Sequence, residues 1–418
     1  MATDPRRTLE TVWRMESARI VAALARLVRD VGLAEELAQD TLVIALEQWP
    51  IDGVPDHPAS WLMATAKHRA LDQVRRKSML ERKHEELSFD LEEQQNKTPD
   101  IEESIDDYVG DDLLRLVFMC CHPVLTTDAR VALTLRMLGG LTTPEIARAF
   151  LVPEATLAQR IVRAKRTLAD AHVPFELPRK SELTERLSSV LDVIYLIFNE
   201  GYSATAGDDW IRPSLCEEAL RLGRILAELV PDDPEVHGLV ALMEIQASRL
   251  RARVGPSGEP VLLLDQDRVR WDQLLIRRGL VALERAEALG GQFGRFALQA
   301  AIAACHARAH TAAETDWTRI AILYDALAQI TPSPVIELNR AVAHAMAFGP
   351  EAGLALADEL VSEPTLKDYH LLPAVRGDLL AKLGRKREAK KQFERAAALT
   401  KNARERELLL ERARAASE

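Results

Sequence analysis

The side chains best suited to chemistry in this sequence form a row that could hydrogen-bond to nucleic-acid bases. Residues 140–165 read GLTTPEIARAFLVPEATLAQRIVRAK. Within and just after this stretch an apolar stripe follows a helical period, at Leu157, Ile161, Ala164 and Leu168. The opposite stripe holds Ala155, Gln159, Arg163 and Arg166, with Arg160 and Lys165 at its flanks. Glutamine and arginine can make bidentate contacts with base edges, and flanking cations can reach phosphates.

Two short helices joined by a tight turn must position that row. Thr143 can cap a helix that has Pro144 at its first position, and Thr142 with Glu145 has the spacing of a capping box. Pro153 interrupts this helix, because it disfavours α geometry at the preceding residue, and is suited to open the next one. The pattern is that of a DNA-reading helix–turn–helix, but a plain amphipathic hairpin would show the same stripes, so the rest of the chain must decide between the two.

Other groups of reactive side chains lack the partners that catalysis or metal binding requires. The run Cys120-Cys121-His122 has no second cluster at ligand spacing, and the aspartates of 265–272 have no nearby nucleophile or phosphate-binding loop. We interpret all four cysteines as reduced, buried thiols: Cys120, Cys121, Cys216 and Cys305. The sequence therefore predicts a protein that is not an enzyme, with no metal and no cofactor.

Composition favours helices and a cytoplasmic protein. Hydrophobic residues make up 47% of the 418 residues and aromatic residues only 5%, which predicts an all-α fold with buried cores in several domains. No apolar run approaches the roughly 18 residues that span a bilayer, so we expect no membrane association. The N-terminus, MATDPRRTLE, lacks the apolar core of a signal peptide.

The formal charge of -10 conceals two basic modules. Residues 57–83 carry seven Lys and Arg against two acids, and residues 113–180 carry ten against five, so each has a net charge of +5. Between them, residues 84–112 have a net charge of -11, which is typical of a solvated linker. Residues 181–418 have a net charge of -5.

The chain before this linker reads as two amphipathic helices, a loop and a basic helix. We expect the first helix to end near Gly32 and the second to run from Ala34 to Trp49. The Pro, Gly and Asp residues of 50–58 predict an exposed break, and 59–83 predicts one long helix.

The chain beyond the two prolines of 173–180 reads as successive helices. One segment places Gly377, Ala389, Phe393 and Ala396 at the small and aromatic positions of a tetratricopeptide (TPR) repeat. A weaker match has Ala341, Gly353, Ala357 and Leu360 at the same offsets.

The order of these parts resembles the bacterial extracytoplasmic-function (ECF) RNA polymerase sigma factors, which keep the promoter-reading domains σ2 and σ4. Three segments carry the likeness: GLAEELAQDTLVIAL (32–46), PASWLMATAKHRALDQVRRK (58–77) and residues 140–165. The remainder resembles the TPR-containing tails of one ECF subgroup. The implied domains are σ2 at 1–83, an acidic linker at 84–112, σ4 at 113–175, and a TPR-like extension at 181–418 with repeats near 320–400.

The resemblance implies a function and three sets of site residues. The protein would bind core RNA polymerase and direct promoter recognition and transcription initiation, regulated by its extension, with a small cytoplasmic protein as a further partner in some relatives. The polymerase-binding residues would be Glu36, Gln39 and Asp40. The -10 element would be contacted by Asp52, His57, Trp61, Lys67, Arg69, Arg75 and Arg76. The -35 element would be contacted by Glu154, Ala155, Thr156, Gln159, Arg160, Arg163 and Arg166.

Two other functions remain open from the residues alone. A stand-alone helix–turn–helix regulator with a sensing tail would bind DNA without polymerase and tolerate charge reversal at Asp40. An enzyme housed in the tail would need a convergent acid, base or metal site, and none is visible in the sequence. Trp61 could likewise stack on an unpaired base or simply pack within the protein.

Overall fold

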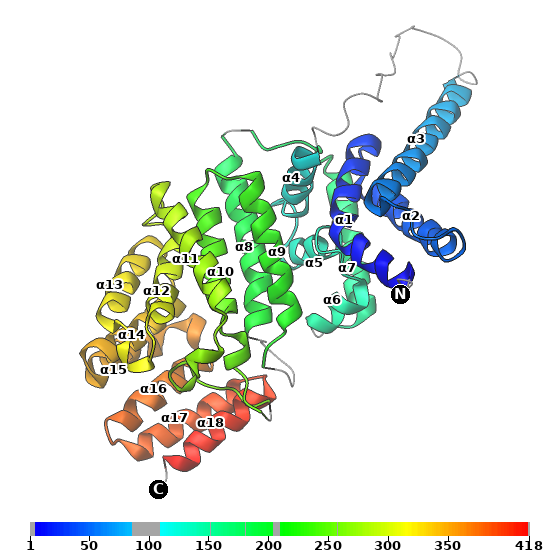
Figure 1. The fold of residues 1–418 in the computed structure, drawn as a ribbon. Helices are drawn as coiled ribbons and strands as arrows, with labels where there is room; N and C mark the ends of the chain where they lie inside the picture. The colour runs from blue at the N-terminus through cyan, green and yellow to red at the C-terminus, as the bar shows by residue number, and fades with distance from the viewer. Residues whose placement is uncertain are drawn as a thin grey trace. The chain divides into compact units, whose positions relative to one another are not determined.

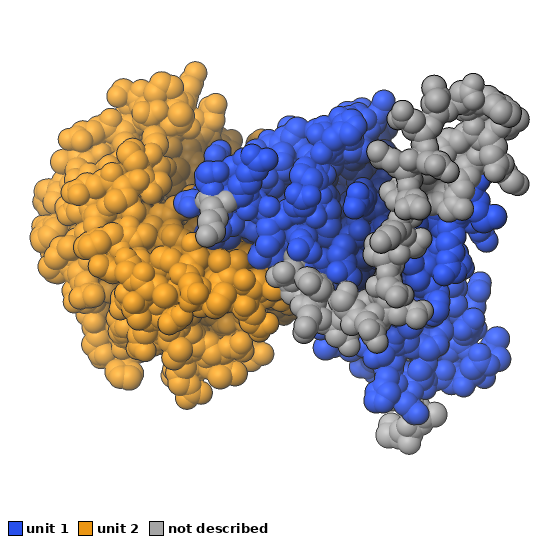
Figure 2. All heavy atoms as spheres, turned by 90° about the horizontal axis from the view of Figure 1, so that it is seen from above, with its two compact units in different colours: residues 1–193 blue, residues 194–418 orange. Residues whose placement is uncertain are grey.

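The computed structural model describes residues 5–85, 109–150, 152–179, 181–203, 210–256 and 258–416. Most of the acidic linker lies outside these ranges. The chain divides into two compact units, residues 1–193 and 194–418 (Figure 2). Apart from an isolated bridge between Val254 and Pro260, the regular structure of the described residues is helical, as the all-α prediction requires (Figure 1).

The helices of the first unit are α1 (Pro5–Val28), α2 (Val31–Asp52), α3 (Pro58–Glu85), α4 (Val109–Cys120), α5 (Thr127–Met137), α6 (Thr143–Ala149) and α7 (Glu154–Asp170). The division between the units falls within α8 (Leu183–Tyr202). The second unit continues with α9 (Pro213–Leu229), α10 (Pro234–Ala247), α11 (Gln273–Ala288), α12 (Arg295–Arg308), α13 (Trp317–Ile330), α14 (Pro334–Phe348), α15 (Pro350–Glu359), α16 (Leu371–Lys382), α17 (Lys386–Leu399) and α18 (Ala403–Ala415). Short 3-10 turns are η1 (Leu250–Ala252), η2 (Leu263–Asp265), η3 (Arg268–Arg270), η4 (Ala312–Glu314), η5 (Leu360–Ser362) and η6 (Pro364–Leu366).

The first helix ends earlier than the sequence predicted. Arg29 takes a positive φ of 55°, which breaks the helix after Val28. Asp30 then caps α2, accepting a hydrogen bond from the backbone N–H of Leu33 at 3.0 Å. Gly32 therefore lies in the first turn of α2, and the prediction that it terminates α1 is wrong.

The loop between α2 and α3 is also shorter than predicted. The helix α2 continues through Pro50 to Asp52, where a proline removes only one hydrogen bond of the last turn. Gly53 ends it with a φ of 89°, and its N–H donates to the carbonyl of Trp49 at 3.1 Å. The predicted break at 50–58 thus shrinks to residues 53–57.

The first helix of the helix–turn–helix, α6, begins at the predicted capping box. The N–H of Thr142 donates to Glu145 Oε2 at 2.8 Å, and the N–H of Glu145 donates to Thr142 Oγ1 at 3.4 Å. Thr142 rather than Thr143 is therefore the cap, since α6 already includes Thr143. Pro153 precedes α7 in extended geometry, as its ring favours.

In the second unit the TPR positions are close-packed. A Cβ on Gly377 would lie 2.9 Å from the ring of Phe393, so only glycine lets α16 approach α17 this closely. Phe393 is 1% exposed and belongs to a core shared by α14 to α18. In the weaker repeat a Cβ on Gly353 would lie 2.4 Å from the Cβ of Ala345, which holds α14 against α15 in the same way.

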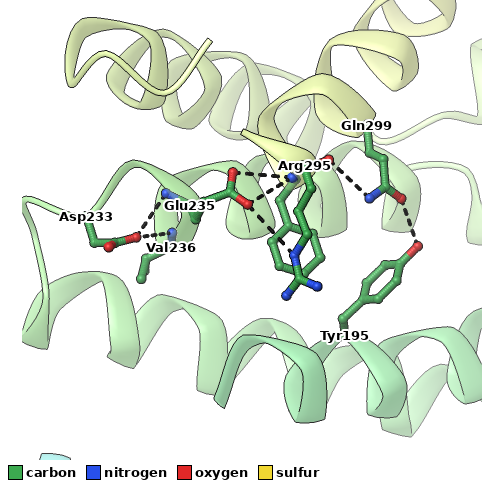
Figure 3. Close-up of polar contacts among 7 residues, drawn as sticks. Tyr195, Asp233, Glu235, Val236, Arg295 and Gln299 are labelled. Atoms are coloured by element: carbon green, nitrogen blue, oxygen red, sulfur yellow. Dashed lines mark hydrogen bonds and ion pairs between the residues drawn. The ribbon is translucent and has the colours of Figure 1, made fainter. Parts of the chain in front are cut away.

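Polar side chains also join α8, α10 and α12 of the second unit (Figure 3). Asp233 caps α10 through the N–H groups of two following residues. Glu235 reaches across to the start of α12 and accepts from the N–H of Phe296 at 3.2 Å. Tyr195 donates to Gln299 Oε1 at 3.0 Å. These contacts give hydrogen-bond partners to half-buried polar groups, while Gly238 brings the backbones of α10 and α12 together.

The four cysteines are buried free thiols, as the sequence predicted. Burial raises the pKa of Cys121 to about 11 and that of Cys216 to about 12. None of the described helices combines the length and the apolar character that crossing a bilayer would require.

Candidate nucleic-acid interface

The helix α7 separates a buried stripe from an exposed one. The apolar stripe is buried at Leu157, Ile161, Ala164 and Leu168, each at most 5% exposed. The residues expected to read the -35 element lie on the solvent side, and six of the seven are exposed: Glu154, Ala155, Thr156, Gln159, Arg163 and Arg166. Because α5 and α6 hold the apolar side, the exposed row is presented on a rigid element.

The flanking cations of α7 are engaged by acids of the same unit. Arg160 is half-buried and pairs with Asp128 of α5 at 3.2 Å. Lys165 pairs with Glu35 of α2. Both would have to exchange these partners before contacting DNA, whereas Gln159 and Arg163 remain directly accessible.

The residues expected to contact the -10 element lie on α3, on the turn before it and at the end of α2. Exposed members are Asp52, His57, Arg69, Arg75 and Arg76, whereas Lys67 and Trp61 are half-buried. The apolar side of α3 is fully buried at Leu62, Ala66 and Ala70. Val74, four residues after Ala70 on the same side of the helix, is 38% exposed, so the packed part of α3 ends before it.

Trp61 packs within the protein. Its ring meets that of Trp49 edge-on, with centroids 5.7 Å apart and planes at 67°. Trp49 is 2% exposed and fixes the end of α2 against the start of α3. Trp61 therefore supports the turn at residues 53–57, and its half-buried ring leaves only part of its surface open to an unpaired base.

The residues expected to dock polymerase lie on the outer side of α2. Glu36 and Asp40 are exposed, and Gln39 is half-buried. Asp40 accepts a hydrogen bond from Arg69 Nη2 at 2.7 Å, so a predicted polymerase contact and a predicted -10 contact are paired with each other.

Sequence reasoning missed an apolar area next to these residues. Val43 and Leu46 of α2 are 51% and 41% exposed, although both are apolar. Leu46 lines a cavity of about 790 Å³ with Trp13, Met15 and Gln39. Met15 is 65% exposed. Exposed apolar side chains rimmed by polar ones mark interaction surfaces, and the signal was the unbroken run LVIAL within a helical pattern.

Sequence reasoning also missed Glu35, which lies 6% exposed between α2, α5 and α7. Arg136 Nε donates to its Oε1 at 2.5 Å, and Lys165 pairs with its other oxygen. A second contact of this kind joins Arg26 of α1 to the buried Asp112 of α4 at 3.2 Å. Within the first unit, the α1–α3 module is therefore packed against the α4–α7 module through buried ion pairs.

Among the residues that the structure describes, no group of three His, Cys, Asp or Glu side chains is arranged to hold a metal ion. His122 instead accepts a hydrogen bond at Nδ1 from the N–H of Val124 at 3.1 Å, closing the turn after α4.

Both helical modules of the first unit match known protein families. Residues 13–79 match Sigma-70 region 2, and residues 115–168 match Sigma-70, region 4. Residues 186–287 match a family of unknown function, DUF6596. The fold and the matched regions thus define a sigma-70 transcription initiation factor, a class of proteins that are not enzymes.

The chain belongs to the ECF sigma factors and carries a long C-terminal extension. It is 30% identical to the ECF RNA polymerase sigma factor SigK of Mycobacterium ulcerans over 36% of this chain and 78% of that protein. It is 31% identical to SigC of Mycobacterium tuberculosis over 39% and 79%. The "Uncharacterized protein R00370" of Rhizobium meliloti is 44% identical over 92% of this chain and 90% of its own length. Among solved structures, yeast Tom70 gives a TM-score of 0.31 at 12% identity, covering 99% of this chain and 85% of that one.

Proposed function

We propose that this sigma factor binds core RNA polymerase through the outer side of α2, reads the -10 element with α3 and the turn before it, and reads the -35 element with α7. The extension regulates this activity, with a small regulatory protein as a further partner. The domain limits and the site residues given above are part of this proposal.

The observation that carries the proposal is the exposed row on α7. Gln159 and Arg163 lie on the side of α7 opposite a fully buried apolar stripe. The helix is therefore well packed, and these two polar side chains are held facing solvent. Their side chains can form bidentate hydrogen bonds with adenine and guanine edges in the major groove. The small Ala155 near the helix start allows close approach to the groove.

Docking on α2 can be tested by titrating core polymerase with the purified protein. Leu46→Glu places a charge in the exposed apolar area beside Gln39 and should weaken the complex strongly. Val281→Glu is the matched control, since Val281 is 64% exposed on α11 of the other unit. Equal affinities for the two variants would remove α2 as the docking surface.

The direction of regulation can be read from a truncation after Val193. The truncated protein keeps the first half of α8, which belongs to the first unit. It therefore keeps the hydrogen bonds from Arg186 Nη2 to the carbonyl of Phe118 at 2.8 Å and from Ser189 Oγ to the carbonyl of Cys121 at 3.0 Å. An extension that shields the sigma modules predicts greater transcription from the truncated protein. An extension that adds a needed contact predicts less transcription, and unchanged transcription would contradict a regulatory role.

A further inference from the structure

The C-terminal hairpin of the second unit is basic, although the extension as a whole is acidic. Residues 381–414 carry twelve Lys and Arg against five Asp and Glu, a net charge of +7. Residues 181–380 carry 18 against 29, a net charge of -11. The positive charge of the extension is thus confined to α17, α18 and their flanks. These helices lie outside the sigma modules, so the proposed contacts of those modules do not explain this charge.

Most of the cations that are free to interact lie on α17. Its buried face holds Ala389, Phe393, Ala396 and Ala397. At about 100° per residue, the centre of the opposite face falls on Arg387, Lys391 and Arg395. These three side chains are exposed, as are Lys386 in the first turn and Lys390 at the edge of the buried face. None of the five forms an ion pair with any residue that the structure describes.

Solubility does not explain this arrangement. A terminal helix of a repeat stack needs a polar outer face, and α18 provides one with four bases and three acids. Its charges are compensated, since Arg404 pairs with Glu407 at 3.4 Å and Arg412 pairs with Asp378. On α17, by contrast, five bases stand against two exposed acids, Glu388 and Glu394, and Glu388 pairs with Arg385 at 2.7 Å. The helix therefore keeps a surplus of positive charge, with Arg387, Lys391 and Arg395 four residues apart on one face.

We propose that the exposed face of α17 binds the phosphate backbone of duplex DNA without reading its sequence. The row from Arg387 to Arg395 is about 12 Å long, at a rise of about 1.5 Å per residue. Duplex DNA carries one charge per about 1.7 Å of its axis, so a row of this length meets several phosphates. The extension thereby gives the sigma factor a DNA contact additional to α3 and α7.

The test measures binding of the full-length protein to a non-promoter DNA duplex by fluorescence anisotropy, from about 50 to about 200 mM salt. One variant combines Arg387→Gln, Lys391→Gln and Arg395→Gln. The matched control combines Arg251→Gln, Arg277→Gln and Arg308→Gln, three exposed arginines of the same unit that do not share a helix face. Each variant loses the same charge, and circular dichroism verifies that both stay folded.

The α17 variant should lower the slope of log affinity against log salt by about two to three, since each lost phosphate contact contributes about 0.9. The control should leave the slope close to that of the unmodified protein. Equal slopes in the two variants would overturn the proposal. So would an α17 variant that loses binding to polyglutamate but not to DNA, because the face would then fit an acidic protein. The assay contains no polymerase and no promoter, so its outcome is independent of the proposed sigma function.

Discussion

Arg136 of α5 donates a hydrogen bond from Nε to Glu35 Oε1 of α2 at 2.5 Å, and the two residues, which belong to different modules, lie 101 positions apart in the chain. Lys165 of α7 pairs with the other oxygen of the same carboxylate. The cavity of about 510 Å³ beside this cluster is lined by Glu36, Gln39 and Asp40, the proposed polymerase contacts. The surface of α2 that would dock polymerase therefore borders the module that would read the -35 element.

Replacing Glu35 should loosen this contact. Glu35→Ala leaves two cations without their acceptor, and removing one partner of a buried pair costs about 3 kcal/mol. Hydrogen exchange should become faster in α2 and α7, and core polymerase should bind more tightly because less energy is needed to separate the modules. Glu47→Gln is the control, on the exposed side of the same helix. If Glu35→Ala weakened polymerase binding, the carboxylate would be a docking residue instead of a restraint.

Arg163→Ala should impair recognition of the -35 element. A good bidentate contact with a base contributes about 1–3 kcal/mol of discrimination, so promoter selectivity should fall roughly 5- to 150-fold. The measurement is holoenzyme binding to promoter fragments that differ in single -35 base pairs. Arg179→Ala removes an exposed arginine outside the helix–turn–helix and should leave selectivity unchanged. Undiminished selectivity in Arg163→Ala would exclude this side chain from readout.

The pair formed by Asp40 and Arg69 separates two possible roles for Asp40. An exposed ion pair contributes only about 0–1 kcal/mol, so Asp40→Ala should hardly alter stability. It should weaken core polymerase binding if Asp40 docks polymerase directly. The exchange Asp40→Arg with Arg69→Asp restores the ion pair and should not restore binding. Recovery of binding in the exchanged protein would show that the ion pair itself, in either orientation, supports binding, and not a direct contact of the Asp40 carboxylate with polymerase.

His306 should make the second unit sensitive to acid. Burial, together with Arg249 and Arg268, lowers the pKa of His306 from the ordinary 6.5 to about 3. Between these values the unfolded chain binds a proton that the folded chain does not, so stability falls as the pH drops below 6.5. The loss is about 1.4 kcal/mol per pH unit.

Urea denaturation at about pH 7 and about pH 5 tests this dependence. The difference between the two pH values should be smaller in His306→Gln than in the unmodified protein. Identical differences in the two proteins would mean that His306 titrates normally.

Gly377→Ala should destabilise the pairing of α16 with α17. The added methyl group would meet the Phe393 ring at 2.9 Å, and overpacking of this kind costs about 1–3 kcal/mol. Hydrogen exchange in α16 and α17 measures the loss. Adding Phe393→Leu to Gly377→Ala should recover part of it, because the smaller side chain makes room. A double variant that is less stable than the sum of the single ones would contradict this cause.

The sequence was sufficient wherever local spacing decides the structure. The buried stripe of α7, the capping box at Thr142 and the small and aromatic positions around Phe393 all follow from periodicity and are present in the structure. Helix ends were less predictable, because they depend on single backbone angles such as the positive φ of Arg29. Pro50 was taken as a break, although the last turn of a helix tolerates it.

Contacts between distant segments could not be predicted from the sequence. Glu35, between Ala34 and Glu36, looks in the sequence like an ordinary surface residue, and only the fold brings Arg136 and Lys165 to it. The pairing of Asp40 with Arg69 likewise depends on how α2 crosses α3. The basic face of α17 was visible in the sequence but averaged out in the net charge of -5 for the whole extension.

The most direct test of the central claim is run-off transcription from genomic promoters by purified core polymerase with this protein. We predict discrete transcripts that require the full-length protein or its truncation after Val193, and that decrease with Arg163→Ala. If neither form yielded a specific transcript from a polymerase that remains active on nicked DNA, the proposed action on polymerase and promoter would be contradicted.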